Sequence, residues 1–192
     1  QSLIEMQIKP LLIDGRNAVE DAFLALRELA SICSGEIGRD VKWRLTEEVL
    51  LDKRLRKIHN ERVVPAVDTV TKLLKYLKDL HTLLMRIPPK DDGDEAPLVS
   101  EKAQLQAYAG RLERTANALL ECTSEELQEN TVRWIEVDAR HDQSIRIARC
   151  PLEVGPPLAE WVYNNLDTVV MTSATLAVRR EFDYLAQRLG LN

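Results

Sequence analysis

The sequence predicts a mainly α-helical fold, in which an elongated antiparallel helical bundle is followed by a small α/β piece with a β-hairpin and one further strand. Three observations predict it. Three long segments between residues 2 and 119 repeat apolar residues at steps of three and four, the spacing of one helix face. Two segments within residues 131–150 are rich in strand formers. An apolar, β-branched run at 168–172 is typical of a strand buried on both faces.

The first predicted helix covers about residues 2–33. Pro10 lacks a backbone N–H, so we expect it to kink or interrupt this helix near its start. Gly35 and Gly38 are expected to end it. Its apolar face consists of Ile4, Ile8, Leu11, Val19, Ala22, Leu26, Leu29 and Cys33.

The second long helix is expected over residues 60–87, with Pro65 acceptable only near its start. We interpret His81 on its apolar seam as a core or partly exposed residue rather than a ligand. Residues 39–60 stay open, because 39–46 alternate like a strand whereas 46–58 also fit a helix. The seam consists of Val63, Val67, Val70, Leu74, Leu77 and Leu84.

The third helix follows a breaker-rich loop at 88–97, and Ser100 is its expected N-cap. Its seam is predicted to consist of Leu105, Tyr108, Leu112, Ala116 and Leu119. Long helices with narrow seams favour an elongated antiparallel bundle.

The last third changes character. Residues 131–137 and 144–150 are predicted to form the arms of a hairpin, and a short helix is expected from Pro156. A final helix carries Phe182, Leu185 and Leu189 and stops at Gly190. The buried strand at 168–172 needs neighbouring strands, which this chain does not supply. We therefore expect the last third to be the rim of a larger domain.

Composition excludes several classes of protein. The 192 residues carry a net charge of −5, whereas a dedicated DNA-binding domain is usually basic, so any DNA contact must be local. There is neither a signal-peptide pattern nor an apolar run of about 18 residues, so no membrane is expected. Cys33, Cys122 and Cys150 are widely spaced, which argues against a zinc site and fits a reduced, cytoplasmic setting. The chain also lacks an initial methionine and opens in helical sequence, as an internal piece would.

Residues 168–176, TVVMTSATL, followed by residues 182–191, FDYLAQRLGL, resemble the DinG family of DNA helicases, relatives of XPD in superfamily two. The resemblance implies a helical arch-like domain at 1–128 and a partial motor-domain segment with the hairpin and the S-A-T motif at 129–192. It also implies that the parent protein uses ATP and Mg²⁺. The partners it implies are single-stranded DNA, through the parent, and the remaining motor domains of the same polypeptide.

Thr172, Ser173, Ala174 and Thr175 form the motif that, by this resemblance, couples ATP hydrolysis to strand movement. Their short hydroxyl groups both donate and accept hydrogen bonds, although the same residues can merely cap a helix. The chain holds no phosphate-binding loop, and Asp94-Glu-Ala-Pro97 only mimics a DEAH box. We therefore expect no cofactor and no ATP hydrolysis in this chain alone. The iron–sulfur cysteines of the family lie before the DEAH box, so a cluster in the parent would lie outside this chain.

A basic run offers a local contact for DNA. It consists of Lys53, Arg54, Arg56 and Lys57, to which Lys42 and Arg44 can add. A solvated helix face explains the same residues. Trp43 can stack on a base or anchor the core. An alternative for the whole chain is a helical protein-interaction module with no catalytic role.

Overall fold

The computed structural model describes residues 3–35, 39–87, 98–126, 129–138, 144–172 and 182–191. These residues form two compact units. Unit 1 comprises residues 1–127 and 133–148, and unit 2 comprises residues 128–132 and 149–192. The fold is mostly helical with a small antiparallel sheet, which confirms the predicted fold class.

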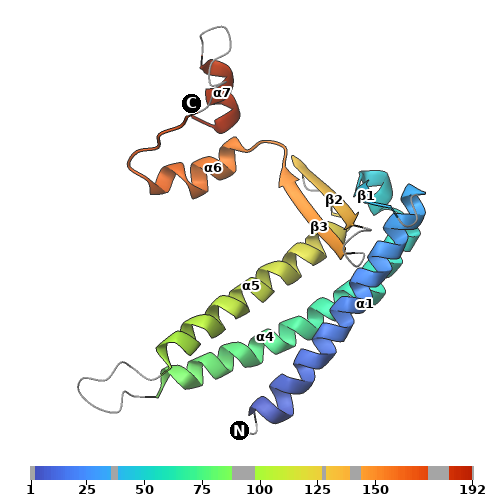
Figure 1. Cartoon of the computed structure of the whole chain (residues 1–192), viewed down its shortest axis with the longest axis vertical. Helices are drawn as coiled ribbons and strands as arrows, with labels where there is room; N and C mark the ends of the chain where they lie inside the picture. Colours follow the sequence, from blue (N-terminus) through green and yellow to red (C-terminus); the bar gives the residue numbers. More distant parts are fainter. Residues whose placement is uncertain are drawn as a thin grey trace. The chain divides into compact units, whose positions relative to one another are not determined.

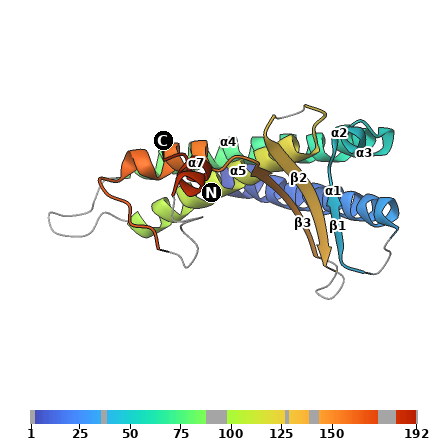
Figure 2. The ribbon, with the colours of Figure 1, turned by 90° about the horizontal axis from the view of Figure 1, so that it is seen from above.

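Unit 1 is built on three long helices. These are α1 (Lys9–Ser34), α4 (Val64–Met85) and α5 (Val99–Thr123). Helix α4 contacts both α1 and α5 and runs opposite to each of them (Figures 1 and 2). Their shared core includes Ala22, Leu26, Leu29, Val67, Val70, Leu74, Ala109, Ala116 and Leu119. The elongated antiparallel bundle predicted from the three seams is therefore confirmed.

Both prolines of the long helices follow a π-helical turn. The π-turn Ile4–Ile8 precedes Pro10, and the π-turn His59–Val63 precedes Pro65. In an α-helix a proline ring clashes with the carbonyl four residues earlier. The wider turn relieves this clash, so the helix continues through Pro10, where we expected a kink or interruption. Pro65 lies at the second residue of α4, near the helix start as expected.

Helix α5 corrects two predictions. It begins at Val99 after Leu98, whose φ is 62°, so Ser100 lies within the helix and is not its N-cap. The core seam passes through Ala109, whereas Tyr108 is 58% exposed and lies beside Arg111. A tyrosine one position earlier on the helix therefore points to the side of the seam.

A three-stranded antiparallel sheet completes unit 1. Strand β2 (Thr131–Asp138) lies between β1 (Val41–Arg44) and β3 (Ser144–Pro151), which confirms the hairpin. The segment left open, 39–60, contains both alternatives, because β1 is followed by the short helices α2 (Glu47–Leu50) and α3 (Lys53–Ile58). Because β1 pairs with β2, most of the hairpin belongs to unit 1 together with the long helices. From the sequence we expected the hairpin in the C-terminal segment, residues 129–192.

Unit 2 contains α6 (Gly155–Trp161), the 3₁₀ turn Tyr163–Asn165 and α7 (Asp183–Leu189). Helix α7 ends at Gly190 in the left-handed conformation, as predicted. Residues 168–172 form no strand: they are irregular, and Val170 is 83% exposed. A strand of this composition needs partners on both sides, and none pairs with it among the described residues.

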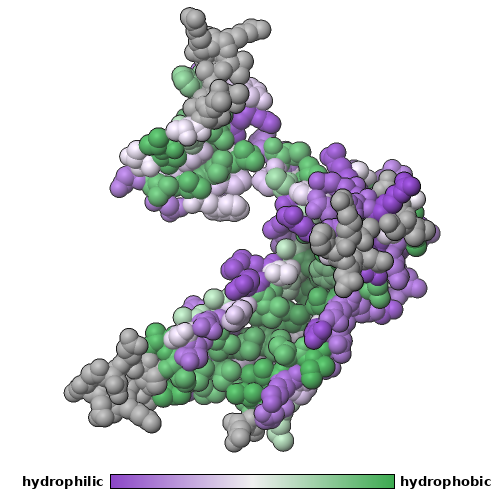
Figure 3. Space-filling model, viewed as in Figure 1, coloured by the Kyte–Doolittle hydropathy of each residue, from purple (hydrophilic) through white to green (hydrophobic). Residues whose placement is uncertain are grey.

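Apolar side chains also reach the surface of the long helices. Among the exposed ones are Leu12, Ile13, Leu83 and Tyr108. Figure 3 shows hydrophobic residues gathered over the bundle of α1, α4 and α5. None of the helices in the described part of the chain is long and apolar enough to cross a membrane.

Candidate nucleic-acid interface

The sheet of unit 1 presents two different faces. Successive side chains of a strand alternate between faces. The inner face packs on the helices with buried Val41, Ile135 and Val137. The pairs Lys42 with Glu136 and Arg44 with Trp134 stand opposite each other on the other face. We call the residues Lys42, Arg44, Trp134, Glu136 and Arg146 the outer face.

Glu136 is the hub of the outer face. Its carboxylate lies 3.0 Å from the Nζ of Lys42 and 3.8 Å from a guanidinium nitrogen of Arg146. It also accepts a hydrogen bond of 2.8 Å from the indole Nε1 of Trp134. The hydrogen bonds from Lys42 and then Trp134 hold the pKa of Glu136 below its usual value. The carboxylate therefore stays ionised and fixes the groups around it.

The two tryptophans near this sheet have different roles. Trp43 is half-buried and packs against the hydrophobic core, so the core-anchor alternative describes it. Trp134 lies on the outer face, with the Nζ of Lys42 5.5 Å from the ring centroid. The predicted site missed Trp134 and Arg146. The alternation of Arg133, Ile135 and Val137 with Trp134 and Glu136 was the signal that could have found the first of them.

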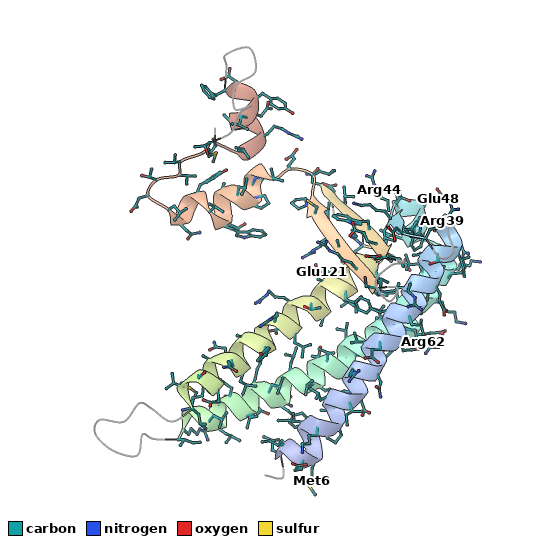
Figure 4. The ribbon with its side chains drawn as sticks, viewed as in Figure 1. Met6, Arg39, Arg44, Glu48, Arg62 and Glu121 are labelled. Atoms are coloured by element: carbon teal, nitrogen blue, oxygen red, sulfur yellow. The ribbon has the colours of Figure 1, made fainter. Side chains whose placement is uncertain are left out.

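The basic run on α3 is mostly engaged with carboxylates of the same chain. Arg54 pairs with Asp52 at 2.7 Å, and this side chain, together with the backbone N–H of Arg54, lowers the pKa of Asp52 to about 2. Arg56 pairs with Glu125 at 2.6 Å. Arg44, by contrast, ends β1, and Figure 4 labels it in the same part of unit 1 as Arg39 and Glu48.

The α3 run is exposed as well as paired. Lys57 lies 3.9 Å from Glu61, and Lys53 is exposed. Exposed ion pairs of this kind are weak and exchange partners readily. The run can therefore contact a phosphate, but it offers fewer free cations than the sequence suggests.

A polar cluster fixes the C-terminal end of α5 to the π-turn His59–Val63, which directly follows α3. The imidazole Nδ1 of His59 lies 2.8 Å from the hydroxyl of Thr123, which itself donates to the carbonyl of Leu119. That hydroxyl has one hydrogen, so Nδ1 of His59 is the donor. Burial lowers the pKa of His59 against the opposing effect of Glu125. The histidine is therefore held in its neutral form.

The coupling motif is only partly described. Thr172 is exposed and lies outside any helix or strand. Ser173, Ala174 and Thr175 lie outside the described residues, as does Asp94-Glu-Ala-Pro97. Within the described ranges no three potential metal ligands gather. His81 is half-buried and lines a cleft of about 420 Å³ between α4 and α5.

Comparison with known proteins shows which proteins this chain is similar to. The chain matches the protein named "Probable ATP-dependent helicase YpvA" of Bacillus subtilis (strain 168) with 24% identity over 100% of the chain and 26% of that protein. The chain is thus similar along its whole length to a protein that is named a probable helicase. It also matches the "3'-5' exonuclease DinG" of the same organism with 42% identity over 60 residues, which is 31% of the chain and 6% of DinG. The chain thus spans about a quarter of YpvA and a small part of DinG. No family model and no solved structure matches it.

Proposed function

We propose that this chain is an internal segment of an ATP-dependent DNA helicase of the DinG/XPD type. Residues 1–128 act as an arch-like domain that guides single-stranded DNA, and residues 129–192 belong to a motor domain. The similarity to a helicase along the whole chain carries this proposal. The similarity to DinG over 60 residues supports it.

The guiding role uses local positive charge, because the chain as a whole is acidic. Lys42 and Arg44 stand on the outer face of the sheet, and the α3 run adds Lys53 and Lys57. Phosphate contacts of this kind give affinity without sequence preference. That suits a protein that moves along DNA of any sequence.

The coupling role uses Thr172, Ser173, Ala174 and Thr175. Hydroxyl groups that donate and accept can change partners without a large motion. ATP and Mg²⁺ bind to parts of the parent protein outside this chain, because the sequence holds no phosphate-binding loop. The chain alone therefore hydrolyses no ATP. The proposal also includes that the parent protein acts in the cytoplasm.

The test is the double substitution Ser173→Ala with Thr175→Ala in the longer protein. Each lost hydrogen bond that leaves a buried partner unsatisfied costs about 1–3 kcal/mol. We expect unwinding of a duplex to fall about tenfold or more relative to ATP hydrolysis, since 1.4 kcal/mol is a factor of ten. ATP binding should persist. Both rates are measured on one preparation, with the melting temperature as the control for folding.

Two outcomes would contradict the proposal. An unchanged ratio of unwinding to hydrolysis with a lower melting temperature means that the hydroxyls only cap a helix. A longer protein that unwinds no duplex supports the alternative, a helical protein-interaction module. The exposed apolar side chains of the long helices, such as Leu12 and Leu83, are the observation that favours this second candidate.

A further inference from the structure

We propose that the outer face of the sheet binds an unpaired base of single-stranded DNA by stacking it on the indole ring of Trp134. Lys42, Arg44 and Arg146 neutralise the phosphates on either side of that base. This inference rests on the proposed function and assigns to it a contact site that the sequence alone did not reveal.

The ring of Trp134 is held ready for stacking. Its Nε1 donates a hydrogen bond of 2.8 Å to Glu136, which restricts the rotation of the side chain. An aromatic ring that is already ordered loses little conformational entropy when it binds. Trp134 is partly exposed, although its neighbours Arg133 and Ile135 are buried. The ring therefore has a fixed position and an accessible surface.

The contact with Lys42 shows that the face of this ring is open to a partner. The Nζ of Lys42 lies 5.5 Å from the centroid of the Trp134 ring, a cation–π distance. The side chain of Lys42 is 71% exposed, so it can leave the ring when a base takes its place. Its ammonium group then lies within reach of the phosphate that follows the base.

The charges on the outer face favour a polyanion. Lys42, Arg44 and Arg146 outnumber Glu136 and Asp138, the two acidic residues that strand alternation places on this side of β2. Arg44 forms no ion pair with any residue that the structure describes. The side chain of Arg146 is 75% exposed, and its ion pair with Glu136 is long, at 3.8 Å, so it is weak. Both guanidinium groups are therefore available to phosphates.

An unpaired strand fits this surface better than a duplex. In a duplex the faces of the bases are covered by their neighbours, so an aromatic side chain has no free base face on which to stack. In a single strand every base offers a π-face, and stacking on an aromatic ring is tolerant of sequence. The combination of one ring with flanking cations is the arrangement found on surfaces that track single strands.

The test uses the 192-residue chain and fluorescein-labelled oligothymidylate, with binding followed by anisotropy. Trp134→Ala should weaken binding about tenfold or more, because stacking on one ring contributes a factor of this order. Trp134→Phe should keep most of the affinity. The matched control is Trp161→Ala, which removes a tryptophan that is 72% exposed on α6 and should leave affinity unchanged.

The phosphate contacts are tested separately, so the inference stays testable even if Trp134→Ala fails to fold. Arg44→Gln and Arg146→Gln should each lower the slope of log affinity against log salt concentration by about one. Arg16→Gln on α1, also exposed, should leave the slope unchanged. Inorganic polyphosphate should compete poorly, because it offers no base.

Equal affinity of the wild type and Trp134→Ala would overturn the inference. So would competition by polyphosphate as strong as that by the oligonucleotide, which would mean binding of any polyanion. Either result leaves the proposed function standing if the longer protein still hydrolyses ATP in response to single-stranded DNA. If single-stranded DNA does not stimulate ATP hydrolysis by the unaltered longer protein, that result instead contradicts the proposed function.

Discussion

Arg133 is a charged residue in the interior of unit 1. It is 3% exposed, and its guanidinium donates to the backbone carbonyls of Ser124, at 3.0 Å, and Glu126. These carbonyls lie just after the C-terminal end of α5, where the helix dipole favours positive charge. Arg133 thus joins the middle strand of the sheet to the end of α5 and positions the outer face.

Replacing Arg133 with Met should lower the free energy of unfolding by about 1–3 kcal/mol, since hydrogen bonds to charged groups contribute this much. Urea denaturation followed by circular dichroism measures it. Arg146→Met on the outer face is the matched control and should change stability by less than about 0.5 kcal/mol, because its side chain is 75% exposed. Equal effects of the two substitutions would show that the buried contacts of Arg133 contribute nothing.

Single residues of the candidate site were only partly predictable. Basic side chains were found by composition: Lys42 and Arg44, which the sequence suggested as DNA contacts, are both exposed, and their contact with DNA stays a prediction. Which tryptophan faces solvent depends on the register of β1 against β2, and that register is a long-range property. The sequence left both alternatives open for Trp43 and did not raise Trp134 as a contact.

At the scale of elements, two glycines bring α6 and α7 together. A Cβ on Gly155 would lie 2.9 Å from the backbone nitrogen of Gly190, and a Cβ on Gly190 would lie 2.8 Å from the carbonyl carbon of Gly155. Such contacts are with backbone, which cannot move aside without separating the helices. Gly190 also has a φ of 72°, which side chains rarely adopt.

We predict opposite effects for two glycine-to-alanine substitutions. Gly155→Ala should reduce the hydrogen-exchange protection of α6 and α7, at a cost of about 1–3 kcal/mol from overpacking. Gly110→Ala on α5 should stabilise unit 1 by about 0.5–1 kcal/mol, because its Cβ would meet only the flexible end of Arg114 at 3.4 Å. Exchange measured by mass spectrometry reports both. Destabilisation by Gly110→Ala, or unchanged protection with Gly155→Ala, would contradict the packing described here.

Elements were predictable where the signal is local. The apolar seams placed the three long helices, and β-branched residues placed the hairpin. The π-turns before Pro10 and Pro65 were not predicted, because a proline alone does not say whether a helix kinks or widens. The start of α5 was wrong by two residues because Leu98, with a φ of 62°, takes the place that a serine cap would fill.

At the scale of the whole molecule, residues 168–172 do not match their sequence. The run Thr168-Val-Val-Met-Thr172 has the composition of a buried strand, yet Val169 is 39% and Val170 is 83% exposed. A strand forms only with partners, so this segment could not be predicted from its own residues. The proposed function supplies the partners from the rest of a motor domain.

We therefore predict that backbone amides of residues 168–172 exchange rapidly in this chain and slowly in the longer protein. Ladder hydrogen bonds to neighbouring strands provide the protection. The amides of α4, which lie in the bundle core, serve as the control and should be protected in both. Rapid exchange of 168–172 in the longer protein would mean that the segment joins no sheet there.

ATP hydrolysis by the longer protein, with and without single-stranded DNA, is the most direct test of the proposed helicase function. We predict hydrolysis that DNA stimulates in the longer protein and no turnover above background in the 192-residue chain, which lacks a phosphate-binding loop. Turnover that stays with the isolated chain through several purification steps, or a longer protein that hydrolyses no ATP in the presence of single-stranded DNA, would contradict it.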